Sequence, residues 1–140
     1  MILKAKKLDP RATLPAYATD GAAAFDLVAI TRTPDGDTCT YGTGLAFEVP
    51  KGYVMHVYSR SSHGFRDSMR LVNCVGVIDS DYRGEVGVKL TRDNGNEQFP
   101  MVGERVAQAM LVKVPNVTIK EAEDLEETVR GKGGFGSTGK

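Results

Sequence analysis

The chain has 140 residues, the size of one ordinary domain, which buries roughly two thirds of its unfolded surface. Lysine plus arginine equals aspartate plus glutamate at 18 each, which excludes a global field that would attract nucleic acid or an anionic membrane. The two cysteines, Cys39 and Cys74, show no zinc or disulfide-framework spacing, and we expect reduced thiols. The charged N-terminus is unlike a signal peptide, and no apolar run approaches the roughly 18 residues that span a bilayer. We therefore expect a cytoplasmic protein with no nucleic-acid and no membrane partner.

Short apolar segments separated by turn residues are typical of an all-β fold, which we expect over residues 1–119. Turns are predicted at 34–36, 50–52 and 93–96, where proline, glycine, aspartate and asparagine cluster. A helical turn is expected at 64–69. The strands are predicted over residues 2–8, 23–30, 44–49, 53–58, 70–74, 84–91 and 105–114.

An acidic stretch precedes the glycine-rich end of the chain. We expect a solvated linker at 120–129 and then a flexible C-terminal arm at 130–140, held off the β domain until it meets a ligand or a neighbouring subunit. A flexible terminus without function is the alternative. The acidic residues are Glu121, Glu123, Asp124, Glu126 and Glu127.

The composition of the arm suits a phosphate chain. Its five glycines allow positive φ and a close approach of backbone N–H groups to an anion. Ser137 and Thr138 add hydroxyl groups, Arg130 adds positive charge, and Phe135 offers a ring for stacking. Residues 134–140 also spell most of a P-loop, but the strand and helix that such a loop joins are not predicted here. We interpret that match as coincidence.

Residues 76–84 read Gly-Val-Ile-Asp-Ser-Asp-Tyr-Arg-Gly, an apolar run that leads directly into two carboxylates. A carboxylate beside an apolar wall can accept a proton from water when a substrate places an electrophile in reach. Asp79, which directly follows the apolar run, is the better candidate base. The alternative is a hairpin turn in which Asp79, Ser80 and Asp81 satisfy backbone groups.

Two other segments combine polar side chains with apolar surroundings. Residues 59–66 place hydroxyl groups beside Arg60, which suits a phosphate, although a simple helix N-cap is the alternative. His63 is interpreted as a surface or pocket-lining residue and not as the catalyst. Residues 103–108 place Gln108 inside an apolar strand, where it needs either a ligand or a backbone partner.

Five segments of the chain resemble the five motifs of the trimeric dUTP pyrophosphatases (dUTPases), and they occur in the same order. The resemblance implies a jelly-roll subunit and a threefold homotrimer whose active sites are shared, with the arm crossing to a neighbour. It also implies hydrolysis of dUTP to dUMP and pyrophosphate, which removes dUTP and supplies dUMP for thymidylate synthesis. The segments are residues 20–27, 59–64, 73–84, 103–108 and 130–139.

The same resemblance implies roles for the residues of the third segment. Asp79 would orient and deprotonate the attacking water and would contact the 3′-hydroxyl of the sugar. Tyr82 would pack against the deoxyribose and exclude a 2′-hydroxyl. Asn73, with the backbone around Cys74 and Ile78, would read the uracil edge and leave no room for a thymine methyl.

Phosphate and metal contacts are implied in the same way. Mg²⁺ would sit on the triphosphate oxygens rather than in a protein cage. Phe135 would stack on uracil, and Asp26 would support the site with Arg105 beside it. The phosphate ligands would be Arg60, Ser61, Ser62 and Gln108, with Arg130, Gly136, Ser137 and Thr138 at the terminal phosphate.

The second segment departs from the family, which usually reads Pro-Arg-Ser-Gly-Leu where this chain has Ser-Arg-Ser-Ser-His at 59–63. Two alternatives to the interpretation as a dUTPase stay open. The related dCTP deaminases share the fold, but they use a glutamate where Lys89 stands and lack this type of tail. A nucleotide-dependent regulatory protein is the other alternative, although Asp79 and the intact arm argue against a dead enzyme.

Overall fold

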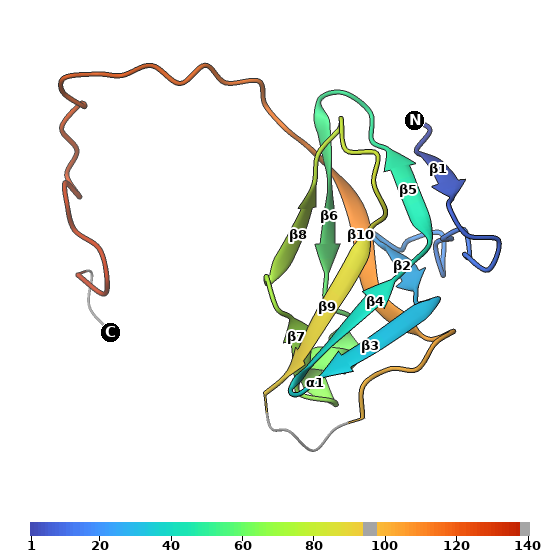
Figure 1. The fold of residues 1–140 in the computed structure, drawn as a ribbon. Helices are drawn as coiled ribbons and strands as arrows, with labels where there is room; N and C mark the ends of the chain where they lie inside the picture. Colours follow the sequence, from blue (N-terminus) through green and yellow to red (C-terminus); the bar gives the residue numbers. More distant parts are fainter. Residues whose placement is uncertain (94–97, 138–140) are drawn as a thin grey trace.

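The computed structural model describes residues 1–93 and 98–137, which form an antiparallel β sandwich (Figure 1). This arrangement confirms the expected all-β class. Between β6 and β7 lies the short helix α1, Ser61–Phe65. The strands of the described residues are β1 Lys4–Lys7, β2 Phe25–Val28, β3 Thr31–Asp35, β4 Thr38–Gly42, β5 Leu45–Glu48, β6 Tyr53–Tyr58, β7 Met69–Leu71, β8 Val75–Ile78, β9 Gly87–Arg92 and β10 Arg105–Lys113.

Two four-stranded sheets form the two layers of the sandwich. One has the order β2-β10-β6-β8 and the other the order β3-β4-β9-β7, and β1 pairs with β5 beside them. Alternate side chains of each strand point between the layers, as the two-residue period of a strand requires. Leu27, Met55 and Leu90 are fully buried there and come from both sheets. This shared core holds the two layers together.

Strand β6 determines where the functional residues emerge. It pairs with β10 on one side and with β8 on the other, so that Met55 lies opposite Ile78 and Tyr58 lies opposite Val75. The residue that follows Ile78 is Asp79, which therefore leaves the sheet near the beginning of β6. The residues that follow Tyr58 leave the sheet at the other end of the strand.

Several predicted boundaries agree with the structure. The strand predicted at 53–58 is β6, and the strands predicted at 44–49 and 105–114 contain β5 and β10. The turn at 50–52 is confirmed, because the Tyr53 N–H donates to the Pro50 carbonyl at 3.0 Å and Gly52 has φ of 83°. The turn predicted at 93–96 falls on residues 94–96, which lie outside the described residues.

Other predictions were wrong. The helical turn lies at Ser61–Phe65 rather than at 64–69, where Ser68 instead takes a positive φ of 45°. The strand predicted at 70–74 ends at Leu71, and Cys74, with φ of 62°, lies in the turn before β8, a strand that was not predicted. The hairpin of β3 and β4 was also missed, and Pro34 lies within β3 rather than in a turn. The residues of β3 and β4 are mostly polar, so their apolar pattern is weak, whereas β8 was missed although its residues are apolar.

Beyond β10 the chain leaves the sandwich. Residues 114–137, which we call the arm segment, contain no helix or strand and run well away from the sheets (Figure 1). Apolar side chains on this segment are fully open to solvent, among them Ile119, Leu125 and Phe135. The proposed division into domain, linker and arm stays a prediction. Within the part of the chain that the structure describes, no helix has the length and hydropathy needed to cross a membrane.

Candidate active site

A shared carboxylate joins three of the sequence motifs at one end of the sheet. Asp26 on β2 accepts a hydrogen bond from Arg60 Nε at 2.8 Å and another from Arg105 Nη1 at 3.1 Å. Arg60 Nη1 also donates to Ser62 Oγ at 3.3 Å. Two guanidinium groups around one carboxylate leave net positive charge, and charge-assisted donors of this kind suit a phosphate. The supporting position expected for Asp26 and Arg105 agrees with this arrangement.

Two hydrogen bonds fix Ser59, the residue before Arg60. Gln108 on β10 donates from Nε2 to the Ser59 carbonyl at 3.0 Å, and Ser59 Oγ accepts from the Leu71 N–H at 2.9 Å. The sequence allowed either a ligand or a backbone group as the partner of Gln108. In the single chain the partner is a backbone carbonyl. The contact of Gln108 with a phosphate stays a prediction. Ser61 is exposed at the start of α1, where its hydroxyl and backbone face solvent.

The burial of His63 is the feature of this site that the sequence predicted least accurately. Its side chain is 3% exposed, so the surface interpretation was wrong, although the ring does line a cavity as the other interpretation held. Nδ1 is buried and has no hydrogen-bond partner among the described residues. Burial and then the positive charge of Arg60 hold the pKa of His63 below its ordinary value. No local pattern distinguishes such a histidine from a surface one.

The cavity beside His63 has a volume of about 530 Å³ and is lined mainly by polar residues. It lies between α1 and the segment that leads into β10. Arg60 and Ser62 border it from one side and Arg105 from the other. The cationic groups around Asp26 and the buried imidazole therefore face one common space.

Residues 72–82, the segment that contains β8, form a second group. The tight turn before β8 is closed by Val75 N–H, which donates to the Asn73 carbonyl at 2.7 Å. Asn73, Gly76 and Ile78 line a hollow of about 410 Å³. Gly76 lies so close to Val57 that an added Cβ would meet the Val57 Cβ at 3.0 Å, so β8 packs tightly on β6. This hollow is a place where a planar base can contact backbone edges.

Asp79 and Tyr82 follow the C-terminal end of β8. Tyr82 N–H donates to the Asp79 carbonyl at 3.2 Å, and Tyr82 Oη donates to the Glu85 carbonyl at 3.0 Å. The ring is therefore held in one orientation although it is exposed. Asp79 is exposed and borders a hollow of about 790 Å³ that also includes His56 and Asp81. A carboxylate in this position is accessible to water and to a bound sugar.

The two groups are separated within one chain. Asp79 leaves the sheet at the beginning of β6 and Arg60 follows its end, and six residues of strand span about 20 Å. The cationic cluster around Asp26 therefore does not reach Asp79 of the same chain.

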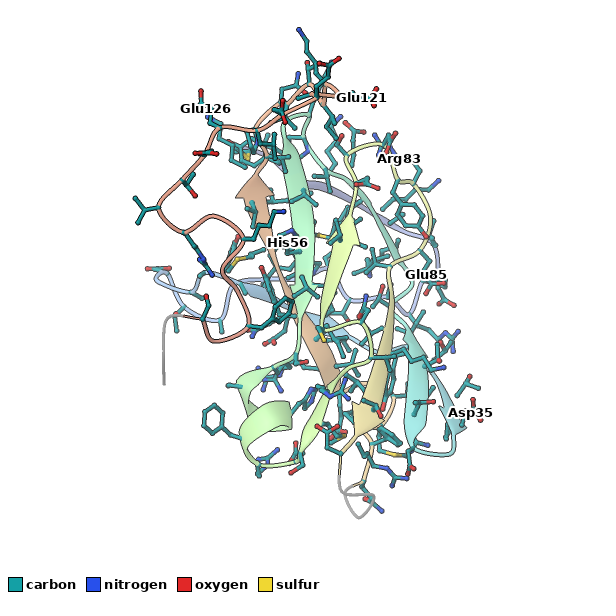
Figure 2. All side chains as sticks on the ribbon, turned by 90° about the vertical axis from the view of Figure 1, so that its left-hand side faces the viewer. Asp35, His56, Arg83, Glu85, Glu121 and Glu126 are labelled. Carbon is teal, nitrogen blue, oxygen red and sulfur yellow. The ribbon has the colours of Figure 1, made fainter. Side chains whose placement is uncertain are left out.

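The described residues of the arm, 130–137, make their own set of turns through hydrogen bonds within residues 128–137. Arg130 Nε donates to the Gly133 carbonyl at 2.9 Å, while Gly131 and Gly136 have φ of 49° and 91°. Phe135 is fully exposed, and Thr138 lies outside the described residues. Figures 1 and 2 show the arm segment outside the sheet that contains β6. His56 lies in the middle of that strand (Figure 2).

Comparison with known proteins decides the family. Residues 10–139 match the family model described as dUTPase. The chain belongs to the dUTPase family. A deoxyuridine 5′-triphosphate nucleotidohydrolase of Nautilia profundicola is 46% identical over 143 residues and covers the whole of both chains. The protein of that name from Caulobacter vibrioides is 44% identical over 135 residues, which cover 90% of this chain and 85% of the relative.

Solved dUTPase structures have the same fold. The Staphylococcus bacteriophage 80alpha dUTPase with dUPNHPP superposes with a TM-score of 0.84, covering 99% of this chain and 98% of that one. The two sequences are 24% identical, so this likeness concerns the fold alone. It confirms the expected dUTPase-like jelly-roll subunit.

The departures of this dUTPase in its second motif are accommodated locally. Ser59 stands where the family usually has proline, and its hydroxyl bonds to the Leu71 N–H. Ser62 stands in place of a glycine but does not have a positive φ, so no glycine is required there. His63 stands in place of a leucine and occupies a buried position that suits either residue by size. The loop geometry therefore tolerates all three changes.

His63 predicts a pH dependence of stability. The fold disfavours the charged ring, whereas the unfolded chain takes up a proton near the ordinary pKa of about 6.5. The unfolded state then binds more protons, so the free energy of unfolding should fall as the pH falls from about 7.5 to about 5.5. His63→Leu should reduce this slope, measured by urea unfolding at one protein concentration. Equal slopes in the two proteins would show that His63 is not held neutral.

Proposed function

We propose that this dUTPase is a cytoplasmic dUTP diphosphatase that cleaves the bond between the α- and β-phosphates of dUTP to give dUMP and pyrophosphate. The match to the family model over residues 10–139 is the observation that carries this proposal. The structure supports it by placing a base-sized hollow, an accessible carboxylate and a cationic cluster on the motifs concerned. The reaction removes dUTP and supplies dUMP for thymidylate synthesis.

Recognition of the nucleoside depends on the segment around β8. Asn73 and the backbone around Cys74 and Ile78 read the uracil edge and leave no room for a thymine methyl, an assignment supported by the hollow that Asn73 and Ile78 line. Size exclusion of this kind discriminates where hydrogen bonds cannot. Tyr82, held by its hydrogen bond to the Glu85 carbonyl, cannot move aside for a 2′-hydroxyl.

Asp79 is the residue that activates water. Its exposed carboxylate accepts a proton from a water molecule that attacks the phosphate chain, while the adjacent sugar fixes the direction of attack. The proton moves from water oxygen to carboxylate oxygen as the new P–O bond forms. Pyrophosphate leaves with the electron pair of the broken bond.

Mg²⁺ would reach the site bound to the substrate. Its ligands would be phosphate oxygens and water, which Mg²⁺ readily keeps. Bound in this way, it would neutralise part of the triphosphate charge.

The phosphates are held by two further parts of the protein. Arg60, Ser61 and Ser62, with Gln108, contact them from the cationic cluster, and Asp26 and Arg105 hold Arg60 in place. The arm closes over the site, stacking Phe135 on uracil and bonding the terminal phosphate through Arg130, Gly136, Ser137 and Thr138. Because these groups lie far from Asp79 in one chain, the functional unit is a homotrimer in which each site uses several subunits.

Deamination of dCTP is the weaker alternative. Lys89, where the deaminases have their glutamate, is exposed on β9 at the edge of the base hollow. A lysine ammonium cannot take the place of a carboxylate as general base. A nucleotide-dependent regulatory partner stays a prediction that does not conflict with hydrolysis.

The proposal is tested by pyrophosphate release from dUTP with Mg²⁺, beside dCTP, dTTP and UTP, with the base of each product identified. We expect release from dUTP and at most traces from the other three nucleotides. No release from dUTP would contradict the hydrolase assignment. Appearance of uracil nucleotide from dCTP would instead favour the deaminase.

Asp79→Asn should lose turnover by a factor of about 10² or more while it still binds dUTP, because the amide keeps the shape but cannot accept the proton. Asp81→Asn is the matched control, since Asp81 lies in the same turn and borders the same hollow. The control should keep most of its turnover. Steady-state pyrophosphate release and separate binding measurements check both variants, and near-normal turnover in Asp79→Asn would exclude it as the base.

Deletion of residues 130–140 should leave a folded protein of unchanged assembly with at most a few per cent of the activity. The described part of this segment contributes no side chain to the core, so stability should change little. Circular dichroism, size-exclusion chromatography and the pyrophosphate assay measure the three properties. Full activity in the truncated protein would show that the arm takes no part in catalysis.

A further inference from the structure

Burying the His63 side chain costs free energy, and this cost calls for a functional explanation. A buried polar atom that lacks a hydrogen bond costs about 1–3 kcal/mol, and His63 Nδ1 has no partner among the described residues. An apolar side chain of similar size would fill the same place without that cost. The imidazole nevertheless occupies the middle of α1, directly after Ser62, and lines the cavity that Arg60 also borders.

Several charged groups surround His63 in the free protein. Burial and the nearest guanidinium, Arg60, both disfavour a proton on the ring, while the carboxylates of Asp67 and Asp26 partly oppose them. A negative charge added to the cavity would act in the same direction as these carboxylates and favour the protonated ring. The charged groups that face the ring from α1, β2 and the entry to β10 are Arg60, Arg66, Arg105, Asp26, Asp67 and Glu104.

A triphosphate bound to Arg60 and Ser62 brings several negative charges to this cavity. The anion offsets the repulsion that Arg60 exerts on a charged imidazole, and inside a protein such interactions are stronger than in water. We propose that His63 is a positioning residue of the phosphate loop, which takes up a proton when a nucleoside triphosphate binds and then supports the loop as a buried cation. This inference rests on the proposed function of the Arg60–Ser62 loop.

The proposal has a thermodynamic consequence for substrate binding. If the bound state holds a proton on His63 that the free state lacks, affinity must rise as the pH falls through this range. A residue that only filled space would leave binding independent of its own protonation. The histidine thus links phosphate recognition to pH, whereas the leucine usual at this position has no group that titrates.

The two histidines of the chain make the test direct. Imidazole ¹⁵N–¹H spectra of the full-length protein, recorded from about pH 5 to about pH 8, report each ring separately. The His63→Leu variant, which lacks one signal, assigns them. His56, whose Nδ1 lies 2.9 Å from Tyr58 Oη on the outer face of β6, is the internal reference. With an α,β-imido analogue of dUTP bound, the titration midpoint of His63 should move to higher pH than in the free protein.

Calorimetry separates a titrating role from a structural one. Binding of the analogue is measured in buffers of different ionisation enthalpy for wild type, His63→Leu and His63→Gln, which is polar but does not titrate. Because the triphosphate itself titrates, the difference between proteins is the informative quantity. Between about pH 8 and about pH 6, wild-type affinity should gain at least about threefold more than that of either variant, with extra proton uptake.

The possible results are distinguishable. Equal proton uptake in wild type and His63→Leu, or a His63 midpoint that the analogue leaves unchanged, overturns this inference while the proposed function stands. Failure of wild type to bind the analogue at any pH overturns the proposed function and the inference with it. Loss of binding in His63→Leu but not in His63→Gln, with no change in proton uptake, would assign the residue a packing role and also overturn the proposal.

Discussion

The antiparallel pairing of β6 with β8 and β10 is the constraint on which the rest of the structure depends. It places Met55 opposite Ile78 and Tyr58 opposite Val75, which sets the direction in which the chain leaves each strand. A slip of one residue would turn every side chain of the strand to the other face. With this register, the candidate base and the phosphate loop emerge at opposite ends of the same strand. The two groups of candidate site residues are therefore far apart within one chain.

The Asp26 carboxylate organises the phosphate end in a comparable way. By accepting hydrogen bonds from Arg60 and Arg105, it joins β2, the loop after β6 and the start of β10. Both guanidinium groups are oriented before a ligand arrives, which reduces the entropy that binding must overcome. The buried His63, whose pKa is lowered by burial and by Arg60, borders the same cavity.

The arm segment contributes little to the domain that precedes it. Its described side chains bury almost nothing, and Gly131 and Gly136 take positive φ in isolated turns. The folded domain therefore does not depend on packing against the described part of this segment.

The sequence by itself determined the fold class and the family. Apolar segments of strand length with turn residues between them indicated the all-β class, and the ordered motifs around Asp79, Arg60 and the arm indicated the dUTPase family. These features are local, because they depend on residue type and spacing along the chain. The hairpin of β3 and β4 escaped prediction because its apolar pattern is weak, and the short strand β8 was missed although its residues are apolar.

Only the tertiary structure decided which motifs share a site and what surrounds each side chain. Long-range pairing brings Asp26 to Arg60 and Arg105 across 34 and 79 residues of sequence, a contact that no local pattern encodes. It also buries His63, which sequence reasoning left between a surface and a pocket, and it separates Asp79 from the phosphate loop. Burial and charge at a residue are set by neighbours distant in the chain, which is why they had to come from the folded molecule.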